Sequence, residues 1–395
     1  MMECSPIFSC GCEISTSIPF VLDDSYICPI GPAIIITAPD GAQLDLNGFT
    51  LTGDIDDPTE AETGILIADV SDVSVFNGSI RGFSVGIEGS GLDGALFDNL
   101  SFDIFETAIQ VTDSQDIKVR NSDFLAGIFS AGGSGVRLSN VIDSVVTNND
   151  FTMTDTETTG VIIDDNSEKA LVNLNTFFFP STEFDGDDPS NEFNAGVVVA
   201  DSTDVTVLRN CFFGPLDGTI LPQTRGVNVD NDGLAAGNND VDIIGNSFKT
   251  LDIGISVSDD EGTNMSNNCL TNTNAAIALT KFATDFKLSK NDFFNNIADV
   301  LLGDGSKIVS EPVKSPKGSK KGTINGKGFC PCALKRLNGS KSSKGAKGSK
   351  MSKAPNMSKA PNTSKAAKGF KMSKAPSMSK APSMSKAPSK SSKII

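Results

Sequence analysis

The sequence predicts an all-β fold, a single right-handed parallel β-helix of about eleven coils, followed by a disordered tail. Three observations lead to this prediction: a repeat of short strands with alternating apolar residues, asparagines spaced by one coil length, and an abrupt change of composition near residue 305. We divide the chain into a cysteine-rich N-terminal cap over residues 1–32, a β-helix over residues 33–304 and a tail over residues 305–395.

The first observation is a small residue followed by aliphatic residues in alternation. Because side chains alternate between the two faces of a strand, one aliphatic set points inward. A single coil cannot bury these side chains, whereas coils stacked about 4.8 Å apart create a continuous apolar interior. The pattern recurs at residues 64–67, 86–87, 108–111, 135–138, 160–163, 196–199, 226–229, 254–257 and 276–279.

The second observation is a series of asparagines, each followed two or three positions later by an apolar residue, usually Phe. Asparagine tolerates the left-handed conformation of a tight bend, and its amide can bond to an asparagine of the next coil. The spacing fits coils of three short strands with insertions in their turns. The series comprises Asn77, Asn99, Asn121, Asn149, Asn175, Asn210, Asn246, Asn268 and Asn291.

Other repeat folds fit less well. No segment keeps a helical period of apolar residues, and strand-breaking residues recur every few positions. The L-x-x-L-x-L pattern of leucine-rich repeats is missing.

The charge of the chain is strongly divided. Residues 1–304 contain 11 Lys and Arg against 48 Asp and Glu, a net charge of −37. Residues 305–395 contain 22 Lys and Arg and a single acid, Glu311, a net charge of +21, which leaves −16 for the whole chain. An acidic body joined to a polycation is typical of an interaction tail.

Composition also excludes several kinds of chemistry. The chain has no His, no Trp and one Tyr, Tyr26. A histidine general base, a histidine metal ligand and a Ser-His-Asp triad are therefore excluded.

Eight cysteines in an even, clustered arrangement favour disulfides in an oxidising compartment. Two disulfides are expected within the N-terminal cap, which contains four of the eight cysteines. Cys211 and Cys269 are expected to be buried small residues, because a coil lies between them and separates them by about 9.6 Å. A zinc site formed by Cys10, Cys12, Cys330 and Cys332 is the alternative for the terminal clusters.

The repeat, together with the stretch from residue 31 to residue 48, resembles the right-handed β-helix superfamily of pectate lyases, polygalacturonases and alginate epimerases. The resemblance covers about 70% of the chain and implies the fold, not an activity. The histidine-containing motifs of the latter two families are missing. A calcium-assisted lyase with an Arg or Lys base is left open, and its candidate residues are Asp164, Asp165, Asp201, Asp230, Arg209 and Arg225.

The longest turn insertions fall on successive coils, at residues 152–158, 180–194 and 214–224. The middle insertion contains Glu183, Asp185, Asp187 and Asp188, whose carboxylates are dense enough for a calcium ion. No EF-hand spacing is present, and a solvent-exposed acidic loop is the alternative.

In the tail, alternation of apolar residues stops, and Met-Ser-Lys-Ala-Pro recurs from Met351 onward. Too little apolar material exists to offset chain entropy, so disorder is predicted. Nearly all its basic residues are lysines, which favours diffuse attraction to an anionic surface. Two series have a lysine at every third position: Lys341, Lys344, Lys347, Lys350 and Lys353, and then Lys365, Lys368, Lys371 and Lys374.

The run of five lysines among serines resembles the silaffins and related silica-associated proteins of diatoms. The resemblance covers about 90 residues and implies contact between the lysines and polysilicic acid. Acidic cell-wall polysaccharide, nucleic acid and the acidic body itself are the other polyanions considered. Nucleic acid is disfavoured, because no aromatic residues interleave with the lysines and the acidic body would repel a duplex.

These observations lead to three hypotheses about function. The first is a secreted, non-catalytic scaffold of the cell wall or extracellular matrix, whose tail binds anionic mineral (silica) or acidic polysaccharide. The second is a calcium-assisted polysaccharide lyase, and the third is an adhesin whose long turns bind glycan. A monomer without a membrane span is expected. No signal peptide is visible, so secretion is inferred from the cysteines and the resemblance.

Overall fold

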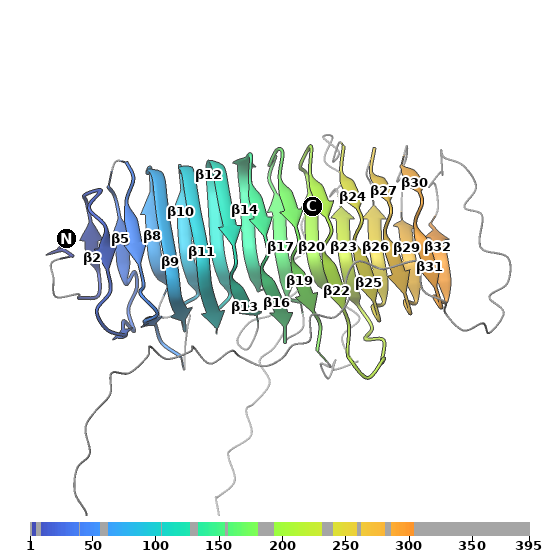
Figure 1. The fold of residues 1–395 in the computed structure, drawn as a ribbon, viewed down its shortest axis with the longest axis horizontal. Coiled ribbons are helices and arrows are strands. Elements are labelled where there is room, and N and C mark those ends of the chain that lie inside the picture. The colour runs from blue at the N-terminus through green and yellow to red at the C-terminus, as the bar shows by residue number, and fades with distance from the viewer. Residues whose placement is uncertain are drawn as a thin grey trace, which may run out of the picture. The chain divides into compact units, whose positions relative to one another are not determined.

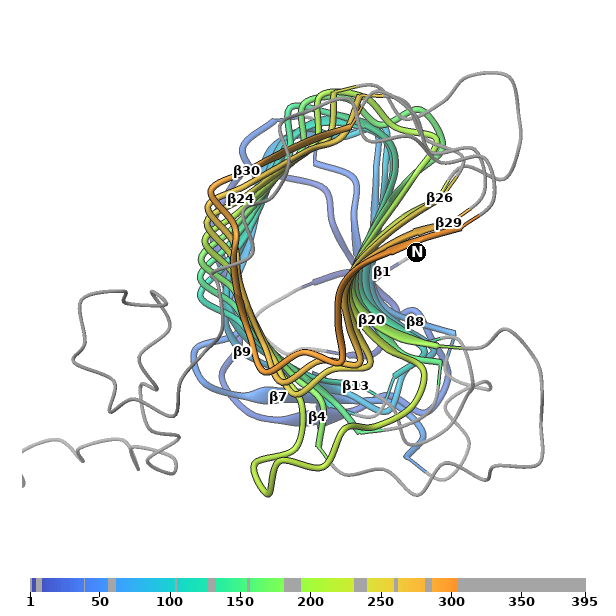
Figure 2. The same cartoon turned by 90° about the vertical axis from the view of Figure 1, so that its right-hand side faces the viewer.

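The protein is a parallel β-solenoid in the computed structural model, which confirms the predicted all-β fold class. Its strands pair in parallel with those of the neighbouring coils, and the coils stack along one axis (Figures 1 and 2). The structure describes residues 2–4, 9–38, 40–55, 62–103, 105–126, 133–154, 157–180, 193–230, 240–258, 262–280 and 286–303.

The coils build three ladders, which we number in the order in which the chain visits them. Ladder 1 contains β1 (Met2–Glu3), β2 (Cys12–Ile14), β5 (Ile34–Ile36), β8 (Thr63–Ala68), β10 (Val85–Ser90), the first part of β12 (Thr107–Arg120), β14 (Ser134–Ile142), β17 (Thr159–Asp164), β20 (Asn194–Ala200), β23 (Thr224–Asp230), β26 (Ile253–Ser258), β29 (Ala275–Thr280) and β32 (Ala298–Leu302).

Ladders 2 and 3 share the long strands β9 (Ser71–Arg81) and β11 (Asp93–Asp103). Ladder 2 also contains β3 (Phe20–Val21), β6 (Gln43–Asp45), the second part of β12, β15 (Val145–Thr147), β18 (Leu171–Asn173), β21 (Thr206–Leu208), β24 (Asp242–Ile244), β27 (Asn264–Ser266) and β30 (Lys287–Ser289). Ladder 3 also contains β4 (Tyr26–Ile27), β7 (Thr50–Thr52), β13 (Asp123–Ala126), β16 (Asp150–Met153), β19 (Thr176–Phe178), β22 (Cys211–Phe213), β25 (Ser247–Lys249), β28 (Cys269–Thr271) and β31 (Asp292–Phe294).

The apolar interior is built from identical positions of successive coils. In ladder 1, Ile87 pairs with Ile109, Ile109 with Val136, and Val136 with Val161, and all of these side chains are buried. Because the strand register is constant, each inward aliphatic side chain packs against the aliphatic side chain at the equivalent position of the next coil. The predicted alternation therefore produces columns of aliphatic side chains along the solenoid.

A stack of phenylalanine rings runs along ladder 3. Successive ring centroids are 4.6 to 5.1 Å apart and the ring planes differ by at most 8°. The stack also explains the small residue at the start of the repeat: a Cβ atom on Gly196 would lie 2.4 Å from the Phe212 ring and 2.7 Å from the carbonyl oxygen of Gly226. The rings belong to Phe102, Phe124, Phe151, Phe177, Phe212 and Phe248.

Most of the predicted asparagines form a buried ladder between ladders 2 and 3. Each Nδ2 donates to the Oδ1 of the asparagine in the next coil at 3.0 to 3.1 Å. The same Oδ1 accepts the backbone N–H of the preceding asparagine at 2.8 to 2.9 Å. These contacts join Asn149, Asn175, Asn210, Asn246, Asn268 and Asn291.

The predicted left-handed geometry of these buried asparagines is wrong, because the residue before each of them makes the bend. Asn148, for example, has a φ of 57°, and Arg209 has a φ of 54°. Asn77, Asn99 and Asn121 do have positive φ and align with Asn148, not with Asn149. The predicted series therefore mixes two rows of residues: an outer row, whose asparagines make the bend, and an inner row, whose asparagine side chains are buried.

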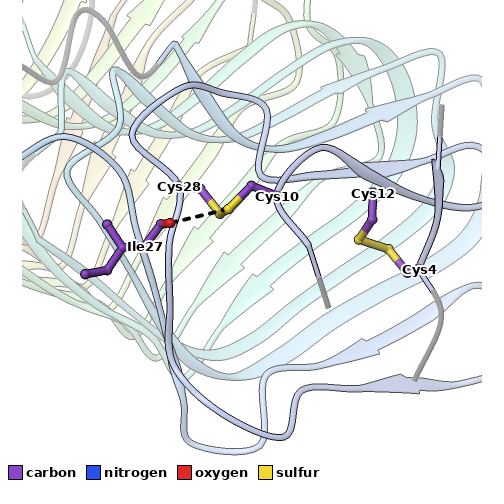
Figure 3. The surroundings of a disulfide bond; sticks show 5 residues. All are labelled: Cys4, Cys10, Cys12, Ile27 and Cys28. Carbon is purple, nitrogen blue, oxygen red and sulfur yellow. Dashed lines mark hydrogen bonds between the residues drawn. A yellow bond between two sulfur atoms is a disulfide. The ribbon is translucent and has the colours of Figure 1, made fainter. Parts of the chain in front are cut away.

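The N-terminal segment is held by the two disulfides expected there. Cys4 is bonded to Cys12 with a Cα–Cα distance of 4.9 Å, and Cys10 is bonded to Cys28 with a distance of 5.5 Å (Figure 3). The zinc alternative for Cys10 and Cys12 is therefore wrong. Ladder 1 already begins within this segment, because β2 pairs with β5.

Cys211 and Cys269 correct a second prediction about cysteines. Both are disulfide-bonded, whereas the sequence suggested two buried, unbonded small residues. Cys211 is only partly buried, and Cys269 is buried.

Candidate functional site

Two of the predicted sites lie outside the described residues. One is the set of tail lysines between Lys341 and Lys374, and the other is the acidic group Glu183, Asp185, Asp187 and Asp188. Both sites remain predictions, together with the calcium ion suggested for the second. In the part of the chain that the structure describes, no group of three or more Cys, Asp or Glu could hold a metal ion.

The acids considered for a lyase site do gather at one edge of the solenoid. Asp164 and Asp230 end β17 and β23 of ladder 1, and Asp165 and Asp201 follow the strands β17 and β20 in the left-handed conformation. Asp164 already has partners, because its Oδ2 accepts a hydrogen bond from Nη2 of Arg137 at 2.8 Å. Such paired surface acids are typical of a polar solenoid face.

The two candidate bases differ in their position relative to these acids. Arg209 forms a bend between ladders 2 and 3, whereas Arg225 is at the opposite end of β23 from Asp230. The Arg225 guanidinium lies 3.7 Å from the centre of the Phe193 ring and donates to Oδ1 of Asn228 at 2.7 Å. Burial lowers the pKa of Arg225, although Asp230 and Asp252 oppose this effect. Arg209 is therefore apart from the proposed acids, whereas the Arg225 guanidinium extends along β23 to Asn228 and is within electrostatic reach of Asp230.

A polar groove of about 490 Å³ follows the bend between ladders 2 and 3 in the first half of the solenoid. Its lining repeats from coil to coil: the asparagine of the bend, the residue that follows it in the sequence, and an outward-facing residue of ladder 3. The lining residues are Asn47, Gly48, Asn77, Gly78, Ser79, Asn99, Leu100, Ser101, Asn121 and Asp123.

Hydrogen bonds between coils fix the amide groups of this groove. Asn99 Nδ2 donates to Asn77 Oδ1 at 2.9 Å, and Asn121 Nδ2 donates to Asp98 Oδ1 at 2.7 Å. Partial burial of Asp98 alone would raise its pKa, but hydrogen bonds from Arg120 and Asn121 outweigh this and lower the pKa. Asp98 therefore stays ionised and holds the neighbouring amide in place.

At the end of the groove, two carboxylates face each other on successive coils. Asp123 of β13 is in register with Asp150 of β16. Partial burial and the negative charge of Asp150 raise the pKa of Asp123. Among the described side chains no ion pair offsets the repulsion between these two carboxylates. The pair therefore lowers the stability of the fold at neutral pH.

We predict that Asp123→Asn stabilises the protein at pH 7 by about 0.2–1 kcal/mol. A carboxyl whose folded pKa is raised destabilises the fold at every pH above its unfolded pKa of about 3.9, and the penalty disappears once both states are protonated. Urea unfolding at pH 7 and at pH 3 measures this. The gain should be present at pH 7 and absent at pH 3; a loss of stability at pH 7 would contradict the repulsion.

The chemistry of the groove suits binding better than catalysis. Amides, hydroxyls and one carboxylate provide donors and acceptors at a repeat of one coil, which matches a hydroxyl-rich polymer lying along the solenoid. None of the lining residues is aromatic, and none forms a nucleophile–base pair. No sequence motif predicts this groove, although the Asn-Gly pair of its lining recurs at residues 47–48 and 77–78.

No protein-family model matches the chain, and no curated protein sequence matches it. The structure is similar to PfbA, a surface adhesin of Streptococcus pneumoniae, with 12% identity, a TM-score of 0.49, and coverage of 72% of this chain and 81% of the adhesin. It is also similar to the tailspike of the E. coli bacteriophage HK620, solved with a hexasaccharide (14% identity, TM-score 0.43, 76% and 59% covered).

A third similar structure is the DFA-IIIase of Arthrobacter chlorophenolicus A6 (16% identity, TM-score 0.39, 60% of this chain and 55% of that chain covered). The chain thus spans less than two thirds of both the tailspike and the DFA-IIIase. At these identities and TM-scores the similarities carry no argument about function, and the β-solenoid fold is shown by the strand pairing of the chain itself. The described residues also contain no helix that is long and apolar enough to span a membrane.

Proposed function

We propose that the protein is a secreted, non-catalytic scaffold or adhesion protein of the cell wall or extracellular matrix. Its tail binds an anionic mineral, silica, or an acidic polysaccharide. The observation that carries this proposal is the separation of charge between residues 1–304, at −37, and residues 305–395, at +21. A polycation of this density is attracted to any extended anionic surface, and its acidic body remains hydrated and soluble.

Two further observations support a scaffold. The solenoid is a continuous stack of paired strands with a filled interior, and an asparagine ladder and a stack of rings run through many coils. Its described surface offers satisfied polar groups and a shallow polar groove instead of a catalytic arrangement. These are properties of a body that presents a surface.

The test is to replace nine lysines of the full chain by glutamine: Lys341, Lys344, Lys347, Lys350, Lys353, Lys365, Lys368, Lys371 and Lys374. A lysine near an anionic surface contributes on the order of 1 kcal/mol. We therefore expect affinity for silica particles to fall by at least about 100-fold at roughly 0.1 M salt, measured by depletion from solution.

The matched control replaces nine lysines outside the two series, namely Lys307, Lys314, Lys317, Lys320, Lys321, Lys327, Lys386, Lys390 and Lys393. Both variants have the same net charge, so an equal loss of affinity in the control would show that total charge determines the binding, and a smaller loss would show that the regular spacing contributes. Unchanged binding of the first variant would overturn the proposal. If the variant without the nine lysines still bound a neutral polysaccharide, the polar groove would be the candidate site for that polysaccharide.

The same preparations distinguish the scaffold from a lyase. A lyase acting on polyuronate in the presence of calcium releases unsaturated sugars that absorb in the ultraviolet. The proposal predicts no such absorbance, with or without calcium. Its appearance would replace the scaffold by an enzyme.

A further inference from the structure

The polar groove contains two hydroxyl groups that the fold itself does not use. Ser79 of β9 and Ser101 of β11 both line the groove and are in register with each other. They point outward, because the next residue in each strand, Ile80 or Phe102, is buried in the interior. Neither hydroxyl has a hydrogen-bond partner among the described residues. Both are therefore free to bond to a ligand.

The bend asparagines form a second row beside these hydroxyls, and their hydrogen-bonding capacity is only partly used. Asn99 Nδ2 donates to Asn77 Oδ1 at 2.9 Å, which holds the Asn99 amide in place. Its own Oδ1 has no donor among the described residues, because Asn121 Nδ2 donates to Asp98 Oδ1 instead. A side-chain amide also has two N–H groups, of which Asn99 uses one in this contact. Asn99 therefore offers one acceptor and one donor at a fixed position.

These groups repeat at the spacing of the coils. The lining extends from Asn47 to Asn121, across the coils of β7, β9, β11 and β13. Three strand spacings of about 4.8 Å give the groove a length of about 14 Å along the solenoid axis. A ligand that uses the whole groove must therefore be extended and must carry donors and acceptors at regular intervals. The ring hydroxyls of a linear polysaccharide meet both requirements, because each hydroxyl donates and accepts.

The charges of the groove disfavour an acidic polymer. The one charged group of the lining is the carboxylate of Asp123, and the lining contains no lysine or arginine. Two further carboxylates lie behind the amide row, since Asp45 accepts from Asn77 Nδ2 at 3.3 Å and Asp98 accepts from Asn121. A polyuronate or a sulfated polymer would meet like charge along the groove, whereas an uncharged polymer would not.

We propose that this groove binds an uncharged linear polysaccharide, which lies along the solenoid axis and bonds through its hydroxyl groups to Ser79, Asn99 and Ser101. This binding activity belongs to the solenoid and needs none of the tail lysines. It is thus distinct from the attraction of the tail to an anionic surface. If the tail binds as proposed above, one chain joins a neutral polysaccharide to an anionic mineral or polymer.

The first experiment uses the full chain in which the nine lysines named above are replaced by glutamine, so that the tail series contribute nothing. Affinity electrophoresis compares native gels that contain hydroxyethyl cellulose, a soluble β-1,3-glucan or a soluble galactomannan with a gel that contains polygalacturonate. We expect at least one of the uncharged polymers to retard the protein and polygalacturonate not to retard it. No retardation by any of the three uncharged polymers, or retardation by polygalacturonate alone, would overturn the proposal.

The dependence on salt provides a second readout. Binding of an uncharged polymer involves no ion pair, so its dissociation constant should change by less than about twofold between roughly 0.1 M and 1 M salt. Isothermal titration calorimetry with the polymer that retards the protein measures this. A large loss of affinity at high salt would show that charge, and not the polar groove, holds the polymer.

A pair of variants assigns the binding to the groove. Ser79→Ala with Ser101→Ala should weaken binding about tenfold, the combined effect of two hydrogen bonds. The control is Ser74→Ala with Ser90→Ala, which removes two unpartnered, half-buried hydroxyls from the outward faces of ladders 2 and 1. It should change the affinity less than about twofold. Circular dichroism verifies that both variants are folded. Unchanged affinity in the first variant, or an equal loss in both, would contradict the assignment.

Silica separates this proposal from the proposed function. The variant Ser79→Ala with Ser101→Ala retains the tail and should deplete from solution on silica particles as the unmodified protein does. The variant without the nine lysines should show the reverse, with polysaccharide binding retained and silica binding lost. Loss of both ligands in either variant would contradict two separate sites. If the unmodified protein did not bind silica, the proposal for the tail would fail and the groove would be unaffected.

Discussion

Phe177→Ala is expected to lower the free energy of unfolding by about 3–5 kcal/mol, the usual cost of removing a buried aromatic ring. The Phe177 ring is fully buried, with its centre 4.8 Å from that of Phe151 and 4.7 Å from that of Phe212. The ring also covers Gly160, where a Cβ atom would lie only 2.5 Å away. Its removal leaves a cavity that neither neighbouring coil can fill without a shift of its own ring.

The next residue in the chain provides the control. Phe178 is in the same strand, β19, but points outward and is partly exposed. Phe178→Ala removes an equal number of atoms and should cost less than about 1 kcal/mol. Urea unfolding followed by the far-ultraviolet circular dichroism of the β-structure measures both variants. Equal losses in the two would show that the ring stack does not stabilise the fold.

The fold could be predicted because its determinants are local and repeated. Alternation of aliphatic residues marks the inward face of each strand, and Phe177 or Phe212 appears at a fixed distance after an asparagine. In a solenoid every coil makes its contacts with its immediate neighbours, so a pattern of a few residues determines the packing of the whole.

The two asparagine rows show where such reasoning fails. Asn121 and Asn149 look equivalent in the sequence, since each precedes a strand with a phenylalanine. The structure pairs Asn121 with Asn148, through a hydrogen bond from Asn148 Nδ2, and places Asn149 one position further inward, beside Ser122. A shift of one residue along the chain moves an asparagine from the exposed bend to the buried row. The sequence pattern is the same in both cases, so it does not distinguish them.

The candidate sites were harder to predict for a different reason. The polar groove has no motif: Asn47, Asn99 and Asp123 are ordinary residues that acquire a role only because the coils align them. The distance between Cys211 and Cys269 predicts that they are not bonded to each other, and the register of ladder 3 places them two strands apart. The error was to infer from this distance that both are unbonded, whereas each of them is disulfide-bonded.

Asn210→Ala is expected to cost about 3–5 kcal/mol, although a surface asparagine can be replaced almost without effect. Asn210 Nδ2 donates to the carbonyl oxygen of Val172 at 2.8 Å and to Asn246 Oδ1 at 3.1 Å. Its Oδ1 accepts the backbone N–H of Asn175 at 2.9 Å. The substitution leaves at least the Val172 carbonyl and the Asn175 N–H buried without these partners, and each unsatisfied group costs about 1–3 kcal/mol.

Two comparisons separate the hydrogen bonds from packing. Asn173→Ala changes an asparagine on the outward face of β18, where its Oδ1 has no hydrogen-bond partner among the described residues, and should cost little. Asn210→Asp preserves the volume but replaces the Nδ2 donor by an acceptor, which then faces the Val172 carbonyl and Asn246 Oδ1. Burial raises the pKa of such a carboxyl, so its loss of stability should be greater at pH 7 than at pH 3. If Asn210→Asp were as stable as the unmodified protein at pH 7, the inner row would be held by shape alone and the amide ladder would be incidental.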